Sequence, residues 1–235
     1  MAKRPAAAAP PMRFRGVPQW LSLSNSALAG HECGEIVLPD ALTAHCGATL
    51  SLPVRNSCAD GASLRLRLAP TAPAGRHLAE LRLSGKSFPV ELDIAPRPSL
   101  RAFPSSAHFA GKPGDNPAIE MSLANRGNVA IELPARAATG IFDDIGLETA
   151  FAETYREKSD DPAHLLGSWL RALRGGYGGL LKLRIGAGAG NLEPGEERSF
   201  EISAHLPECL KPGHSYHGVW KLGPLHYRIT VAVQR

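Results

Sequence analysis

Hydrophobic and polar positions alternate along several short segments of this 235-residue chain. Apolar residues recur at every second position over 50–54 and again over 119–123, and an asparagine follows each run, at Asn56 and Asn125. A period of two places one set of side chains on one face of a strand, which is typical of a half-buried antiparallel sheet. Asparagine favours a turn after each strand, because it tolerates the left-handed backbone conformation.

A second pair of segments shares another order of elements. Residues 73–94 predict a turn, a strand, a short hairpin loop and a second strand, and residues 212–233 predict the same series. Two copies of one antiparallel sandwich explain both matches most economically. We therefore expect a mostly β protein with two tandem sandwich domains, over residues 20–97 and 98–235.

The two copies resemble the immunoglobulin-like β-sandwich modules of bacterial proteins, of the CARDB and fibronectin type III kind. Two stretches carry the resemblance: residues 119–128, and a corner segment with Pro212, Gly213 and Tyr216. The corner segment is similar to the tyrosine corner that opens the penultimate strand of such modules. In the first copy His77 stands where the tyrosine is expected, so the corner is absent or altered there. Such modules mostly serve adhesion, spacing and protein contact, so the resemblance implies no catalytic activity.

The second copy is about 70 residues longer than the first, since 87 residues separate Asn125 from Pro212 but only 17 separate Asn56 from Pro73. Part of this addition predicts strands, over 179–185 and 197–204. The rest predicts a helical hairpin, inserted at about residues 141–176.

The pattern within the insertion indicates two amphipathic helices. One apolar face runs over residues 145–155 and another over 165–173. The second helix has Asp160 or Asp161 as its N-cap, Pro162 in its first turn and a glycine pair, 175–176, as its stop. A family-specific function would be built on this insertion.

The side chains of the insertion allow two interpretations. Acidic residues precede basic ones, an order that complements the helix dipoles without any chemistry, although a pair of catalytic carboxylates is conceivable. The aromatic residues most simply pack against the sheet, and the alternative is an exposed groove for a partner protein. The candidate partner-binding residues are Phe151, Tyr155, Trp169 and Leu173.

Charge and composition narrow the function classes. Of 26 basic residues, four lie in the first 31 positions, where no acidic residue occurs, which leaves 22 basic against 22 acidic residues in the body. A neutral body argues against dedicated nucleic-acid binding. We expect residues 1–19 to be a disordered, basic, Ala/Pro-rich arm. Its run of four alanines is short for a secretory signal, so we expect a cytoplasmic bacterial protein without a membrane span.

Cysteines and glycine runs offer weaker hypotheses. Cys33, Cys46 and Cys58 lie close in sequence beside His31 and His45, but no CxxC pair is present, so ordinary cysteines are favoured over a metal or thiol site. The glycine-rich runs at 175–179 and 186–190 match no phosphate-binding motif and predict hairpin loops. We expect no cofactor and no metal.

Together these patterns favour a non-enzymatic interaction or scaffold subunit of a larger assembly, with protein partners. One alternative is a two-domain chaperone or carrier that holds a client strand between its sandwiches. A third hypothesis is a metal- or thiol-dependent protein that uses the three clustered cysteines.

Overall fold

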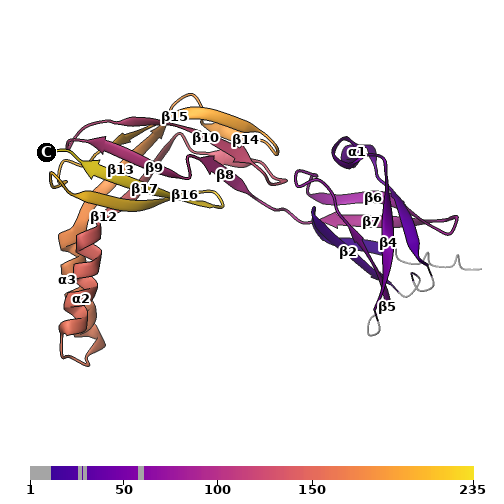
Figure 1. Ribbon diagram of the computed structural model, residues 1–235, viewed down its shortest axis with the longest axis horizontal. Coiled ribbons are helices and arrows are strands. Elements are labelled where there is room, and N and C mark those ends of the chain that lie inside the picture. The colour runs from indigo at the N-terminus through magenta and orange to yellow at the C-terminus, as the bar shows by residue number, and fades with distance from the viewer. Residues whose placement is uncertain (1–11, 26–27, 29–30, 58–60) are drawn as a thin grey trace, which may run out of the picture. The chain divides into compact units, whose positions relative to one another are not determined.

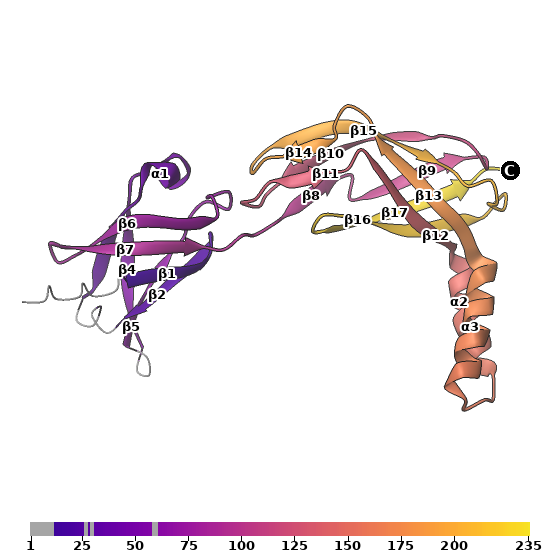
Figure 2. The ribbon, with the colours of Figure 1, turned by 180° about the vertical axis from the view of Figure 1, so that it is seen from behind.

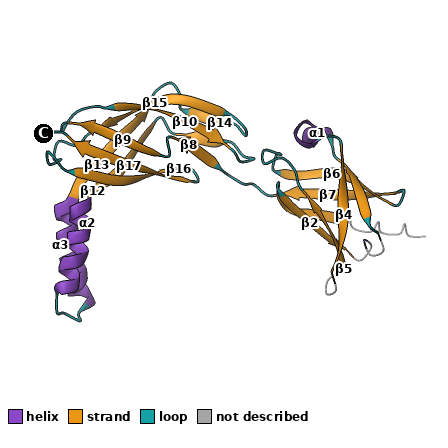
Figure 3. Cartoon of the chain, in the orientation of Figure 1, coloured by secondary structure: helices purple, strands orange, loops and turns teal. Residues whose placement is uncertain are grey.

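The computed structural model describes residues 12–25, 28, 31–57 and 61–235, with the side chains of 44–46, 56–57, 61 and 144–147 left out. The chain divides into two compact units (Figure 1). Unit 1 comprises Met1–Pro98 and the turn Arg126–Val129, and unit 2 comprises Ser99–Asn125 and Ala130–Arg235. Both units are built mainly from strands, and the helices among the described residues are one short segment and one hairpin (Figure 3).

In the described part of unit 1, seven strands form a closed barrel around an apolar core (Figure 2). Its elements are β1 (Met12–Val17), β2 (Trp20–Asn25), β3 (Cys33–Val37), α1 (Asp40–Cys46), β4 (Thr49–Ser57), β5 (Gly61–Leu66), β6 (Gly75–Leu83) and β7 (Lys86–Ile94). The strands pair in the order β1-β2-β5-β4-β3-β6-β7, and parallel pairing of β7 with β1 closes the ladder.

The N-terminal part of unit 1 differs from the disordered arm that was expected. Residues 12–17 form strand β1, which pairs with both β2 and β7, so the prediction of disorder through residue 19 is wrong for this segment. Phe14 is fully buried, while Arg13 points outward and its guanidinium lies 2.7 Å from the Glu91 carboxylate. Burial of the aromatic ring offsets the cost of ordering this arginine-rich strand. Residues 1–11 lie outside the described part of the chain.

Unit 2 contains ten strands and the helical hairpin. Its elements are β8 (Leu100–Phe103), β9 (Ser106–Gly111), β10 (Ala118–Asn125), β11 (Ile131–Leu133), β12 (Arg136–Asp143), α2 (Asp144–Arg156), α3 (Pro162–Gly176), β13 (Tyr177–Ile185), β14 (Gly190–Leu192), β15 (Glu197–His205), β16 (Ser215–Leu222) and β17 (Leu225–Val233). Eight strands pair in the order β8-β10-β15-β13-β12-β16-β17-β9, and β11 pairs with β14.

The strand order of unit 2 is that of an immunoglobulin-like domain. One group, β8-β10-β15-β13, and another, β12-β16-β17-β9, enclose a shared core, and β9 runs parallel to β17. Antiparallel pairing of β12 with β13 joins the groups, so the hydrogen-bonded ladder is continuous instead of forming the two separate sheets of the predicted sandwich. In both units the ladders are therefore more barrel-like than we expected.

The predicted strand hairpins are confirmed. Strands β6 and β7 are joined by Ser84 and Gly85, both with positive φ, as a tight two-residue hairpin requires. Strands β16 and β17 pair in the same way around Gly223. The predicted strands at 179–185 and 197–204 lie within β13 and β15. Period-two burial in these strands follows from the alternation in the sequence.

In each unit a corner lies at the start of the last hairpin, where the chain enters β6 in unit 1 and β16 in unit 2. In unit 2 Tyr216 is buried, and its hydroxyl oxygen accepts a hydrogen bond from the backbone N–H of Lys211 at 3.1 Å. Gly213 takes a positive φ of 80° within this turn. In unit 1 His77 donates from Nε2 to the Pro73 carbonyl at 3.1 Å. A histidine thus makes the local side-chain-to-backbone bond of an altered corner.

Candidate functional site

The helical hairpin between β12 and β13 is the part of unit 2 that its strand ladder does not require. Figure 1 shows α2 and α3 side by side, projecting from the end of the β12–β13 pair. The core of unit 2 contains no side chain from the described part of either helix. The hairpin therefore presents its side chains outside the main core.

Local signals set the ends of α3. The Asp161 carboxylate accepts a hydrogen bond from the Ala163 N–H at 3.1 Å, and Pro162 occupies the first helical position. Both features were predicted, because an N-cap carboxylate satisfies a free N–H and proline needs no donor there. The helix ends at Gly176, where the Tyr177 N–H reaches the Arg174 carbonyl.

The hairpin buries small side chains and forms polar contacts near the loop between its helices. Ala150 of α2 and Ser168 of α3 are buried. The Ser168 hydroxyl donates to the Glu157 carboxylate, whose second oxygen lies 2.9 Å from Nε2 of His164. These contacts fix the end of the hairpin that lies away from the sheet.

The base of the hairpin is anchored to the sheet. Asp143 is buried, and its Oδ2 lies 2.6 Å from Nδ1 of His214. The rings of Phe142 and Tyr177 lie 5.2 Å apart, on residues that pair across β12 and β13. Asp143 and Glu157 therefore have structural partners, which leaves the catalytic-carboxylate alternative without support from these two residues.

One side of the hairpin exposes large apolar side chains. Phe151 is 60% exposed and Tyr155 95% exposed on α2, and on α3 Leu166 and Leu170 are 56% and 52% exposed. Trp169 and Leu173 are half-buried. The interpretation that Phe151 and Tyr155 pack against the sheet is therefore wrong, because the hairpin extends away from the sheet.

The exposed residues of the two helices lie on the same side. Phe151 and Tyr155 lie about 100° and 140° around α2 from the buried Ala150, counted in the direction of the chain. Leu166 and Leu170 lie about 120° and 160° around α3 from the midpoint of its buried positions, Ser168 and Gly176. Because the helices run antiparallel, equal rotations lead to one side.

A ring contact agrees with this geometry, since the centroids of Phe151 and Trp169 lie 5.9 Å apart across the two helices. We call this surface the hairpin face. It comprises Phe151, Tyr155, Leu166, Trp169, Leu170 and Leu173. The sequence pattern predicts Leu166 and Leu170 on the apolar helix face, but they are not among the predicted partner-binding residues. Their exposure follows only from the position of the hairpin.

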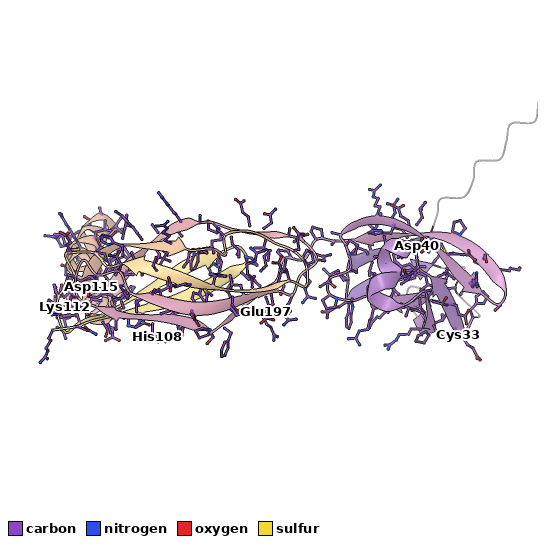
Figure 4. All side chains as sticks on the ribbon, turned by 90° about the horizontal axis from the view of Figure 1, so that it is seen from above. Cys33, Asp40, His108, Lys112, Asp115 and Glu197 are labelled. Atoms are coloured by element: carbon purple, nitrogen blue, oxygen red, sulfur yellow. The ribbon has the colours of Figure 1, made fainter. Side chains whose placement is uncertain are left out.

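The cysteine hypothesis is only partly within the described residues. Cys33 lies on β3 and is exposed (Figure 4), whereas the Cys46 side chain and all of Cys58 lie outside them. Among described side chains no group of three metal ligands occurs. The hypothesis of a three-cysteine site therefore stays a prediction.

The first glycine run serves packing instead of forming the predicted loop. Tyr177, Gly178 and Gly179 belong to β13. A Cβ on Gly178 would lie 2.5 Å from the Tyr216 ring, so this glycine allows the buried tyrosine to reach its place. The second run, 186–190, joins β13 to β14, as predicted.

Three pKa shifts occur in the described strands and turns, and none lies on the hairpin. Hydrogen bonds from the Ser87 hydroxyl and the Arg82 guanidinium lower the pKa of Glu80. The Glu193 backbone N–H and the Arg198 guanidinium lower the pKa of Glu196. Burial raises the pKa of Tyr227 to about 12.

Comparison with known proteins gives structural matches only. No protein-family model matches the chain, and no curated protein matches it. Among the described residues no helix is long and apolar enough to cross a membrane.

Solved structures that match include the two-domain fragment IG1+IG2 of DIP-gamma, at 12% identity over 96% of this chain and 99% of that one, with a TM-score of 0.34. The ASH/PapD-like domain of human CEP192 matches at 14% identity over 57% of this chain and 84% of that one, with a TM-score of 0.30. Domains 4 and 5 of the S-layer protein SbsC match at 13% identity over 91% and 82%, with a TM-score of 0.29. Overlaps this loose carry no argument about function. The description of the chain as mostly β and immunoglobulin-like therefore rests on its own strand order and corners.

Proposed function

We propose that this chain is a non-enzymatic interaction or scaffold subunit of a larger cytoplasmic bacterial assembly, built on tandem immunoglobulin-like domains. Its main contact with a partner protein is the hairpin face. The observation that carries the proposal is the exposure of four large apolar side chains on one side of a hairpin outside the core.

Physical chemistry supports this use of the hairpin face. Contiguous exposed apolar surface is unfavourable in water and is typical of protein–protein contact sites. An amphipathic helix recognises its partner through residues spaced by three or four positions, and Phe151/Tyr155 and Leu166/Leu170 have this spacing. Aromatic side chains are also enriched where interfaces are most buried.

Site-specific crosslinking tests the proposal in the native cell. A photoreactive benzoylphenylalanine replaces Tyr155 in the full chain, and the matched control carries it in place of Glu153. Glu153 is also exposed on α2 but points about 160° away from Tyr155. We expect a defined adduct from position 155, identified by mass spectrometry, and none from position 153. Equal adducts from both positions, or none from either, would contradict a contact through the hairpin face.

A further inference from the structure

We infer that the hairpin face binds the same face of a second copy of this chain, so that two hairpins form a four-helix bundle. The inference rests on the proposed function, since it names the partner of the same surface. The bundle has a twofold axis parallel to the helices, which places α2 of one copy over α3 of the other.

The exposed side chains of the two helices lie at matching levels along the hairpin. At about 1.5 Å per residue, Phe151 lies about 10 Å from the start of α2, and Leu170 lies about 9 Å from the end of α3. Tyr155 and Leu166 lie about 16 and 15 Å from the same base. Rotation about a twofold axis parallel to the helices leaves the distance of each residue from the base of the hairpin unchanged. It therefore sets Phe151 against Leu170 of the second copy, and Tyr155 against Leu166.

The two halves of the hairpin face differ in side-chain shape. The most exposed side chains of the half on α2 are aromatic rings, whereas those of the half on α3 are leucines, and Trp169 on α3 is half-buried. Facing halves thus combine flat rings with branched aliphatic side chains, which interdigitate better than two rows of identical shape. This complementarity is isologous, because each copy supplies both halves.

The two helices of the hairpin carry opposite net charges. Helix α2 contains three acidic residues and one arginine, for a net charge of −2, whereas α3 contains two arginines and no acidic residue, for +2. At the outer edge of the face, exposed Glu148 lies about 20° beyond Tyr155 on α2, and exposed Arg174 lies about 40° beyond Leu170 on α3. No ion pair joins either side chain to another described residue.

The same twofold axis brings these two edges together. Glu148 and Arg174 lie about 6 and 3 Å above the base of the hairpin. Glu148 of one copy therefore lies near Arg174 of the other, twice in the dimer. The alternative twofold axis, perpendicular to the helices, would place α2 against α2 and bring the acidic helices together, which like-charge repulsion disfavours.

The area of the hairpin face sets the expected affinity of the dimer. Two helices about 20 Å long and about 10 Å wide present roughly 400 Å², less than the roughly 800 Å² per partner of a standard interface. We expect a reversible dimer with a Kd on the order of 10 μM.

Sedimentation equilibrium of the full chain measures this association over about 1 to 200 μM, a range that brackets the expected Kd. Leu170→Glu buries a charge in the centre of the face and should leave a monomer. Glu148→Arg alone and Arg174→Glu alone should each raise the Kd roughly three- to tenfold, since each creates two like-charge contacts at exposed positions. The double variant, Glu148→Arg with Arg174→Glu, should return the Kd to near its original value.

Two controls separate pairing from general charge and folding effects. Glu153→Arg changes the same net charge on the opposite side of α2 and should leave the Kd unchanged. Circular dichroism should give the same helix content for every variant, because the altered residues are exposed.

A wild-type chain that stays monomeric to 200 μM would overturn the inference, as would a double variant no tighter than the single ones. If the chain is monomeric while position 155 still crosslinks a different protein, only the second-copy inference fails. If the chain is monomeric and position 155 gives no adduct, the proposed function fails as well.

Discussion

The two units reach the same local corner with different side chains. Tyr216 of unit 2 combines a buried ring with a hydrogen bond to the Lys211 N–H. His77 of unit 1 makes its bond to the Pro73 carbonyl, but its smaller ring is only partly buried. The bond is therefore common to both units, whereas the packing belongs to unit 2 alone. This difference predicts unequal costs for equivalent substitutions.

The largest effect is expected at Tyr216. Tyr216→Ala should lower the free energy of unfolding of unit 2 by about 3–5 kcal/mol, because it leaves a cavity beside Gly178 and Leu210. Hydrogen exchange measured by mass spectrometry reports this loss strand by strand in both units. Tyr216→Phe keeps the ring and should cost only about 1 kcal/mol. Equal costs for the two variants would show that the bond, and not the packing, stabilises the corner.

The next largest difference in stability between the units is expected at alkaline pH. Tyr227 follows the turn of the last hairpin in unit 2, and its hydroxyl donates to the Pro104 carbonyl at 3.0 Å. At the matching place in the β6–β7 hairpin unit 1 has Phe88. The folded-state pKa of Tyr227 is raised to about 12, so between about pH 10 and 12 the unfolded chain loses this proton while the folded chain keeps it.

This contribution of Tyr227 to stability is complete below pH 10 and is lost as the pH rises. Unit 2 should lose up to about 2 kcal/mol across that window relative to Tyr227→Phe. Urea titrations at pH 9 and pH 11.5 measure the difference, followed by the fluorescence of Trp220 in a chain with phenylalanine in place of Trp20 and Trp169. A parallel pH dependence in the chain and in Tyr227→Phe would contradict the assignment to Tyr227.

A smaller effect is expected at His77. His77→Ala removes one hydrogen bond with little packing and should destabilise unit 1 by about 1 kcal/mol. His77→Gln retains an N–H donor and should recover part of this loss. Hydrogen exchange in β6 and β7 provides the measurement. A loss as large as that of Tyr216→Ala would mean that the two corners are energetically alike after all.

The smallest stability effect is expected from removal of the hairpin. Replacing residues 145–175 by a short Gly/Asn turn should change the unfolding free energy of unit 2 by less than about 1 kcal/mol, because the described helices add nothing to its core. The same variant should no longer form a dimer. Loss of the folded unit on deletion would show that the hairpin is structural.

Local patterns predicted much of this molecule. Alternation identified the β6–β7 and β16–β17 hairpins, because one buried face with period two is visible within each strand. The N-cap Asp161 with Pro162, and the stop at Gly176, marked the ends of α3. These signals act within a few residues, so a single sequence contains them.

Features that depend on contacts between residues far apart in the sequence could not be predicted from local patterns. Strand β1 is defined by parallel pairing with β7, about 80 residues away, and its arginines concealed the buried Phe14. Helix α1 has only seven residues, too few for a periodic pattern. The need for glycine at 178 comes from the Tyr216 ring on another strand.

For the candidate site, the sequence pattern indicates a helical face but not what surrounds it. The pattern placed Phe151 and Tyr155 on one helical face, but an apolar helical face looks the same in sequence whether a sheet or a partner covers it. Only the position of the hairpin shows that these two side chains are exposed.

The pairing of Phe142 with Tyr177 has an evolutionary consequence. The hairpin leaves and re-enters unit 2 at residues that face each other on adjacent strands, about 5 Å apart. Any segment whose two ends meet at that spacing can replace it without rethreading a strand. The end of the β12–β13 pair is therefore a place where one inserted segment can be exchanged for another in evolution while the strand ladder stays the same.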